Sequence, residues 1–244
     1  MRSAPTVDVI SVIDRIALVL ACFDADDDRL GISELARRAG LPKSTVSRLV
    51  SELVEHRYLE RDSGGVRLGL RLFELGQLAT QPRALRALAV EAMADLRDEI
   101  GQTVQLAVLD GGDRVCLGVL HSRAASRRLP RAGERSPAHA SAAGRVLLAF
   151  AATATAEALT GRNVLERTGT ATLENELADI RARGVAFDVD PQTGRVVGVA
   201  AIVLAAQGEP VAAIAASAGA DPFDPWLVTP AVRTAAAEIG RLAS

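Results

Sequence analysis

The first part of the chain alternates short amphipathic segments with residues that break helices. Apolar residues recur at helical spacing over Val9–Phe23 and again over Ile32–Ala39. Gly40 is expected to end the second segment, because glycine adopts the left-handed conformation past a helix end at little cost. Pro42 suits the first turn of the next segment, which runs to His56, since its missing N–H is not needed there. The pattern predicts three consecutive helices.

Two further patterns precede the predicted domain boundary. Residues 58–70 alternate apolar and polar positions around Ser63-Gly64-Gly65, which predicts a small β-hairpin. Leu70–Thr80 returns to helical spacing, and Gln81-Pro82 is expected to end it, because the residue before a proline avoids the helical region. We therefore expect one domain over residues 1–69, a linker helix over 70–81 and a second domain over 82–244.

The second domain is predicted to be α+β on an antiparallel sheet, because its strands fall into hairpins with helices clustered between them. Gly111-Gly112 and Gln207-Gly208 mark the two tightest turns. Helices are expected over Ala84–Ile100, Ala140–Ala151, Leu173–Arg183 and Pro230–Leu242. Strands are expected over Thr103–Asp110, Asp113–Leu120, Ser122–Leu129, Val185–Val189, Val196–Leu204 and Val211–Ala216.

Composition narrows the class of protein. Of the 244 residues, 49% are hydrophobic and 24% charged, which is enough to build real cores. The net charge of −2 does not indicate a nucleic-acid binder as a whole, so any such role needs a local patch. Cys22 and Cys116 with three scattered histidines form neither a disulfide framework nor a zinc pattern, so no metal or cofactor is expected. The longest uncharged apolar run, Val196–Gly208, is too short to span a bilayer, and a cytoplasmic setting is the expectation.

The segments on either side of Gly40 match a helix-turn-helix. Ala36 supplies the small residue where the two helices would pack closest, and Val46 and Leu49 continue the buried stripe. The opposite face carries hydroxyls and cations, including Lys43, the only lysine of the chain. Such side chains read base edges and hold phosphates in the major groove.

Charge supports a nucleic-acid role for this segment. Residues 37–71 hold eight cationic side chains against four acidic ones, although the chain as a whole is negative. The hairpin, with two arginines around its Ser-Gly-Gly tip, is expected to act as a wing that contacts the DNA backbone or minor groove. The candidate DNA-binding residues are Arg37, Lys43, Ser44, Thr45, Ser47, Arg48, Arg61 and Arg67.

The stretch SELARRAGLPKSTVSRLVSELVEHRYLERD, followed by VRLGLRLFELG, resembles the winged helix-turn-helix of the IclR (isocitrate lyase regulator) family of bacterial transcription regulators. The likeness continues in order through HASAAGRVLLAF, RARGVAFDVD and AASAG, and so covers nearly the whole chain. The resemblance implies a dimeric, often tetrameric, regulator that binds operator DNA. It also implies a GAF-like C-terminal domain that binds a small metabolite, and a helix from Leu70 that links the domains and helps them dimerise.

A candidate effector site begins at the sequence HASAAGRV. His139 and Ser141 stand with small residues at a helix start, where exposed N–H groups favour an anion such as a carboxylate; a tight start chosen for packing is an equally good interpretation. Taken alone, Asp188 is best read as a soluble loop residue, and Ser217 as a hydroxyl that satisfies a backbone group. The family resemblance assigns to the effector site, by position, Ala142, Ala143, Asp188, Gly198, Ala215 and Ser217.

This chain departs from the family pattern at three places in and beside this site. The usual Gly-Lys at the helix head is Gly144-Arg145, a frequent cysteine is Gly198, and a frequent serine is Ala215. Fewer polar partners and more room favour a small organic acid with an apolar body, such as an aromatic or short-chain carboxylate. Arg145 could instead supply a second anion contact and favour a dicarboxylate.

Two other functions compete with that of a ligand-controlled regulator. Ser141, His139 and Asp188 could act as nucleophile, base and orienting acid of a hydrolase, but residues two apart at a helix start rarely share a face, and no GxSxG motif is present. A DNA-binding protein without a ligand would need a more basic chain. The sequence does not give the identity of the effector, the operator, or whether regulation is by repression or activation.

Overall fold

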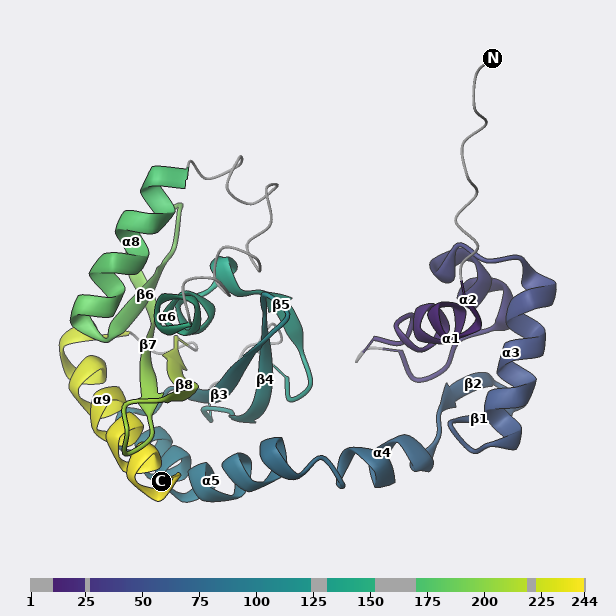
Figure 1. The fold of residues 1–244 in the computed structure, drawn as a ribbon, viewed down its shortest axis with the longest axis horizontal. Coiled ribbons are helices and arrows are strands. Elements are labelled where there is room, and N and C mark those ends of the chain that lie inside the picture. The colour runs from purple at the N-terminus through teal and green to yellow at the C-terminus, as the bar shows by residue number, and fades with distance from the viewer. Residues whose placement is uncertain (1–10, 25–26, 124–130, 152–169, 219–222, 244) are drawn as a thin grey trace, which may run out of the picture. The chain divides into compact units, whose positions relative to one another are not determined.

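The structure, a computed structural model, describes residues 11–24, 27–123, 131–151, 170–218 and 223–243 (Figure 1). Contacts divide the chain into two compact units, Met1–Thr80 and Gln81–Ser244, called the N-terminal and C-terminal units below. Across the described ranges, no helix is long and apolar enough to cross a membrane. The N-terminal unit contains α1 (Val12–Leu20), α2 (Ile32–Ala39), α3 (Lys43–Glu55), β1 (Leu59–Asp62), β2 (Gly65–Leu68) and α4 (Leu70–Gly76).

The turn between α2 and α3 has the geometry that the sequence predicts. Gly40 adopts a left-handed conformation with φ 64°, and its N–H donates to the carbonyl of Ala36, which closes the end of α2. Leu35 on α2 and Val46 and Leu49 on α3 are buried together in the core of this unit. The helix-turn-helix is therefore confirmed, and its buried stripe fixes which face of α3 remains exposed.

The hairpin after α3 is also confirmed. β1 and β2 pair antiparallel from Leu59 opposite Leu68 to Asp62 opposite Gly65, with Ser63-Gly64 as the two-residue turn. Leu30 joins the pair through two backbone hydrogen bonds with Val66, of 2.9 and 3.0 Å. This third segment ties the hairpin to the helical core.

The helix expected over Leu70–Thr80 is wrong in its C-terminal half. α4 ends at Gly76, and α5 (Thr80–Ile100) begins at Thr80, ahead of the predicted start at Ala84. Pro82 does not break a helix here because it stands in the first turn of α5, where its missing N–H has no helical acceptor to lose. The break falls instead over residues 77–79.

The C-terminal unit is an α+β domain on a six-stranded antiparallel sheet of order β5-β4-β3-β8-β7-β6, which confirms the predicted fold class (Figure 1). Its strands are β3 (Thr103–Asp110), β4 (Asp113–Leu120), β5 (Arg135–Pro137), β6 (Val185–Val189), β7 (Val196–Leu204) and β8 (Pro210–Ser217). Its other helices are the 3-10 turn η1 (Ala138–Ala140), α6 (Ala142–Phe150), α8 (Thr170–Arg183) and α9 (Pro225–Leu242).

Apart from α5, five elements of this unit differ from the prediction. α8 starts three residues early, at Thr170, and β8 (Pro210–Ser217) is one residue longer at each end. The other three are a strand and two helices. The third strand is not Ser122–Leu129: Ser122 and Arg123 are not in a strand, residues 124–130 lie outside the described ranges, and β5 pairs with β4 instead. α6 starts two residues late because Ala138–Ala140 forms the 3-10 turn. α9 starts five residues early, at Pro225, because the Asp224 side chain caps it.

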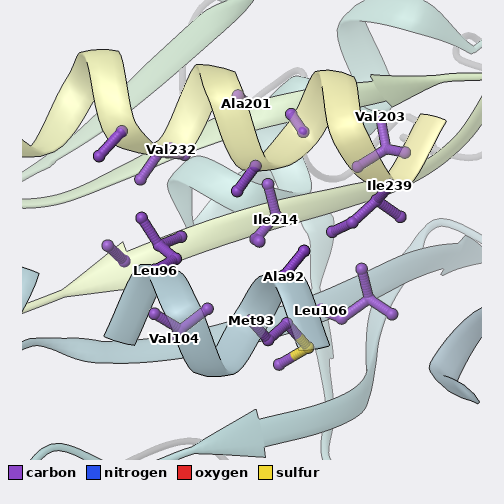
Figure 2. Close-up of a cluster of buried hydrophobic side chains, with 14 of the residues drawn as sticks. Ala92, Met93, Leu96, Val104, Leu106, Ala201, Val203, Ile214, Val232 and Ile239 are labelled. Atoms are coloured by element: carbon purple, nitrogen blue, oxygen red, sulfur yellow. The ribbon is translucent and has the colours of Figure 1, made fainter. Parts of the chain in front are cut away.

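Both faces of the sheet are covered by helices, which explains its nearly continuous apolar strands. Along β7, Val199, Ala201 and Val203 pack toward α5 and α9, while Ala200 and Ile202 pack toward α6 and α8. Figure 2 shows the first of these cores, in which side chains of α5 and α9 meet around Ile214 of β8. The other face, under α6, holds the candidate effector residues.

Candidate functional site

The exposed face of α3 is the candidate DNA-binding surface. Lys43, Ser44, Ser47 and Arg48 are exposed, and Thr45 is half-buried. Pro42 at the N-cap contributes no side-chain hydrogen bond, so the N–H groups of the first turn have no side-chain cap. Free N–H groups and the positive end of the helix dipole favour a phosphate at this end of α3.

The cations of this unit differ in how far they are already paired. Within the described ranges, Lys43 and Arg61 have no acidic partner, and Arg48 has only a loose, exposed contact of 3.8 Å with Glu52. Arg37 is held 2.6 Å from Glu34, and Arg67 is held 2.6 Å from Glu60 across the hairpin. Of the candidate cations, Lys43, Arg48 and Arg61 therefore need the least rearrangement to meet a phosphate.

Another arginine on α2, Arg38, has a structural role. It pairs with Glu34 at 2.8 Å and with Asp27, and it donates to the carbonyl of Cys22 at 3.0 Å. Hydrogen bonds from Arg37 and Arg38 lower the pKa of Glu34 to about 2. This network fastens α2 to the segment that follows α1.

The N-terminus of α6 binds a carboxylate of the chain itself. The Ala142 N–H donates to Oδ1 of Asp188 at 2.6 Å, and the Gly144 N–H donates to Oγ of the N-cap residue Ser141 at 3.2 Å. Two N–H groups of the first turn are thus occupied. One of them belongs to Ala142, which the family resemblance assigns to the effector site. Arg145 lies beside them, 3.2 Å from Asp188 and 2.9 Å from Glu176.

The strand register brings three of the predicted effector residues into one row under α6. Asp188 lies opposite Gly198 on β7, and Gly198 lies opposite Ser217 on β8. A Cβ at residue 198 would stand 3.3 Å from both Cβ and Oδ2 of Asp188, so glycine leaves room for that carboxylate. Ala215 is buried on the same face, two residues from Ser217.

Ser217 differs from the interpretation that its residue type alone favours. Its Oγ is buried and has no hydrogen-bond partner in the described part of the chain, so it does not satisfy a backbone group there. A buried hydroxyl without a partner costs free energy, about 1–3 kcal/mol. Such a group beside Gly198 is available to hydrogen-bond a bound molecule.

Sequence reasoning missed two polar residues of this face. Gln105 on β3 lies directly opposite Ala215, so both side chains are on the α6 side of the sheet. Nη1 of Arg114, on β4, donates to Oε1 of Gln105 at 2.6 Å. The signal was a glutamine within the otherwise apolar TVQLAVLD and an arginine at the start of the facing strand.

The hydrolase constellation is not assembled in the described residues. The Ser141 hydroxyl accepts from Gly144, Asp188 is bonded to Ala142 and Arg145, and His139 contributes its backbone carbonyl to Arg145. None of these bonds joins the three side chains to one another. The described residues also contain no group of three potential metal-ligating side chains.

Both units match known family models. Residues 12–63 match the IclR helix-turn-helix domain, and residues 77–241 match the family described as bacterial transcriptional regulator IclR C-terminal. Among curated proteins, the chain is 30% identical over 217 residues to the HTH-type transcriptional regulator XynR of Escherichia coli, covering 86% of each chain. It is 28% identical to the transcriptional repressor IclR of the same organism, covering 89% of this chain and 83% of that protein.

A solved structure is similar over nearly the full length. It is an IclR homolog from Microbacterium hydrocarbonoxydans complexed with 4-hydroxybenzoate. The two share 30% sequence identity with a TM-score of 0.80, over 94% of this chain and 98% of that one.

Proposed function

This chain belongs to the IclR family of bacterial transcription regulators, and on that premise we propose that a small organic acid controls its affinity for operator DNA. The acid binds between α6 and the sheet of the C-terminal unit, and α3 of the N-terminal unit reads the operator. Two side chains without a partner among the described residues carry the proposal. They are Lys43, at the exposed start of α3, and Ser217, whose buried hydroxyl lies under α6.

The exposed residues of α3 support the DNA-binding part. A recognition helix presents its N-terminal residues to base edges, and Lys43, Ser44 and Ser47 stand at that end of α3. Arg48 directly follows Ser47 and is also exposed, and Arg61 on β1, which has no acidic partner among the described residues, is placed to contact the DNA backbone from the wing. Short hydroxyls and unpaired cations are suited to bases and phosphates respectively.

Exposed apolar side chains support a homodimer, or a dimer of dimers, built through the N-terminal unit. Ile13 on α1 is 78% exposed, Phe73 on α4 is 63% exposed and Leu78 after α4 is 69% exposed. Large apolar side chains that are this exposed on a small unit are suited to burial in an interface. A two-fold dimer then matches a near-palindromic operator whose half-sites are about one helical turn, or a multiple, apart.

The chemistry around α6 supports an aromatic hydroxy acid as the effector class. Gly198 and Ala215 leave a small apolar floor, and Ser217 adds one hydroxyl. The homolog that binds 4-hydroxybenzoate shares the fold of this chain at 30% identity. An apolar ring with polar groups at its ends fits such a surface.

We propose no enzymatic activity and a cytoplasmic location. The curated relatives are transcription regulators, and Ser141, His139 and Asp188 are engaged with other groups. A DNA-binding protein without a ligand is less well supported, because the larger unit would then have no role in regulation.

The test has two stages. Selection from a random-sequence duplex pool should return a near-palindromic site bound by the full chain. In a thermal-shift screen, one of 4-hydroxybenzoate, benzoate and pyruvate should then raise the melting temperature of the protein, since a ligand that binds only the folded state stabilises it by mass action. The same acid should change affinity for the selected site. A pool that yields no preferred sequence contradicts the DNA-binding part, and an acid that binds without changing DNA affinity contradicts the regulatory part.

A further inference from the structure

We infer that Arg114 and Gln105 bind the carboxylate of the effector, so that the acid points its charged end at β3 and β4 and its other end at Asp188. The inference rests on the proposed function and identifies the polar groups at the two ends of that site. A helix N-terminus favours an anion, so the start of α6 by itself would predict that the carboxylate lies there; the inferred orientation of the ligand is the reverse.

The start of α6 disfavours a second carboxylate. Oδ1 of Asp188 already accepts from the Ala142 N–H at 2.6 Å. The nearby cation, Arg145, already has two acidic partners, Asp188 at 3.2 Å and Glu176 at 2.9 Å. A ligand carboxylate placed here would meet the like charges of Asp188 and Glu176, which is unfavourable in a partly buried site. The buried Nε of Arg145 makes no hydrogen bond in the described residues, but the charge of Arg145 is already balanced by these two carboxylates.

Arg114, unlike Arg145, has only one acidic partner among the described residues. It is 4% exposed, and its one acidic partner within the described ranges is Glu134, at 3.4 Å and itself 42% exposed. Its other two acceptors are neutral, the Gln105 amide at 2.6 Å and the Ser136 hydroxyl at 3.1 Å. A buried cation whose one counter-ion is screened by solvent gains from an additional anion.

Donors remain available for that anion. A guanidinium has five N–H bonds, and three of those of Arg114 have acceptors among the described residues. Gln105 accepts from Arg114 through its oxygen, which leaves its NH₂ group without an acceptor in the same ranges. Arginine and amide N–H groups together suit a carboxylate, which accepts two or more bonds side by side.

The register of the sheet places these donors beside the predicted site. Gln105 lies opposite Ala215, and the row Asp188–Gly198–Ser217 runs across the neighbouring strands. β6 and β3 are separated by β7 and β8, and Gln105 lies two residues along β3 from Thr103, which pairs with Ser217. Three strand spacings and this offset give roughly 16 Å between the Cα atoms of Asp188 and Gln105. The floor between them at Gly198 and Ala215 has no side chain larger than a methyl group, and in the inferred arrangement the ring of the ligand lies over it.

The other end of the ligand then has a defined chemistry. Asp188 is an acceptor and Ser217 can donate or accept, so the group that faces them should be a hydrogen-bond donor such as a hydroxyl. A second carboxylate there would be repelled by Asp188. The site therefore selects hydroxy-substituted aromatic monocarboxylates over dicarboxylates.

The deciding variant is Gln105→Glu in the full chain. It keeps the side-chain shape and gives Arg114 a buried acidic partner, so folding should survive, while the anion site is neutralised. By isothermal titration calorimetry, we expect 4-hydroxybenzoate to bind at least about ten-fold more weakly than to the wild type, with 4-hydroxybenzamide, which is neutral, changed far less. Gln207→Glu, in the exposed β7–β8 turn, adds the same charge elsewhere and should leave both affinities unchanged.

The outcomes separate the two proposals. If the wild type binds 4-hydroxybenzoate and Gln105→Glu binds it equally well, the Arg114–Gln105 assignment is overturned while the effector role stands. Terephthalate bound as tightly as 4-hydroxybenzoate overturns the orientation toward Asp188. If the wild type binds none of 4-hydroxybenzoate, benzoate and pyruvate, the proposed organic-acid effector falls, and this inference falls with it.

Discussion

Asp188 accepts a hydrogen bond of 2.6 Å from the backbone N–H of Ala142, although the two residues are 46 positions apart in the chain. The bond joins the end of β6 to the start of α6. The same carboxylate oxygen is 3.2 Å from Arg145, so one acidic side chain compensates both the helix N-terminus and a cation. A molecule bound beside Asp188 therefore acts on the junction between a helix and the sheet under it.

Replacing the exposed cations of α3 should weaken DNA binding without unfolding the protein. Lys43→Ala and Arg48→Ala are each expected to cost about 1–3 kcal/mol if they contact bases, and less if they contact only phosphate. Lys43→Arg keeps the charge and tests whether the slimmer cation is required. Fluorescence anisotropy on the selected operator measures the effect, with Arg241→Ala on α9 as the matched loss of an exposed cation. Wild-type affinity in both alanine variants would remove α3 as the reading helix.

Charges placed on the exposed apolar residues should separate the subunits. Ile13→Glu and Phe73→Glu are expected to shift the protein toward monomers in sedimentation velocity at micromolar concentration, because burying a carboxylate at an interface is costly. Operator affinity should fall together with assembly. Leu242→Glu, at an exposed apolar position on α9, serves as the control. Unchanged sedimentation of the first two variants would place the interface elsewhere.

Two serines near the effector site should respond in opposite ways. Ser217→Ala removes a hydroxyl that has no partner in the described residues, so the melting temperature should stay the same or rise. Its effector affinity should drop by about 0.5–1.5 kcal/mol, the value of one hydrogen bond. Ser141→Ala removes the N-cap of α6 and should cost about 0.5–2 kcal/mol of stability instead. Calorimetry and thermal melts on both variants measure the two effects, and a destabilised Ser217→Ala protein with unaltered affinity would refute the assignment.

Gly144 should tolerate no side chain. A Cβ at this position would lie 1.9 Å from the carbonyl oxygen of Ala138, so Gly144→Ala must displace backbone at the start of α6. We expect a loss of several kcal/mol, at the upper end of single substitutions. At Gly76, in α4, a Cβ meets nothing within 4 Å, and alanine there should be neutral or stabilising. Denaturant unfolding of the two variants provides the comparison, and equal stability would contradict the close approach at Ala138.

The N-terminal unit should lose stability in acid through Glu34. Arg37 and Arg38 lower its pKa from 4.5 to about 2. A carboxyl whose pKa is depressed on folding contributes stability that is fully present above its unfolded pKa, and that stability is lost as the pH falls from about 4.5 towards 2. Amide hydrogen exchange in α2, measured over this range, should show the loss, and Glu34→Gln should show a smaller pH dependence. An identical profile in the variant would mean that other acids govern the transition.

Local patterns predicted most of the fold because the interactions that decide it are local. Gly40 ends α2 through its own backbone freedom, and Gly111-Gly112 closes the β3–β4 hairpin with φ values of 57° and 88°. The alternation of apolar residues in strands, and their helical spacing in helices, then predicted which side of each element faces a core. The pattern failed where one residue type has two roles. Pro82 predicts a helix break, although it stands in the first turn of α5, and β5 is too short to show a period.

The exposed face of α3 followed from the sequence by itself, since burying Val46 and Leu49 leaves Lys43 and Arg48 on the outside. The polar groups under α6 did not follow, because they meet only through strand pairing between distant segments. No spacing rule joins Asp188 to Ala142, or Arg114 to Gln105, until the order β5-β4-β3-β8-β7-β6 sets them on one face of the sheet. The sequence thus determined most of the elements and the exposed face of α3, while tertiary structure decided which charges are already compensated within the described residues and which are not.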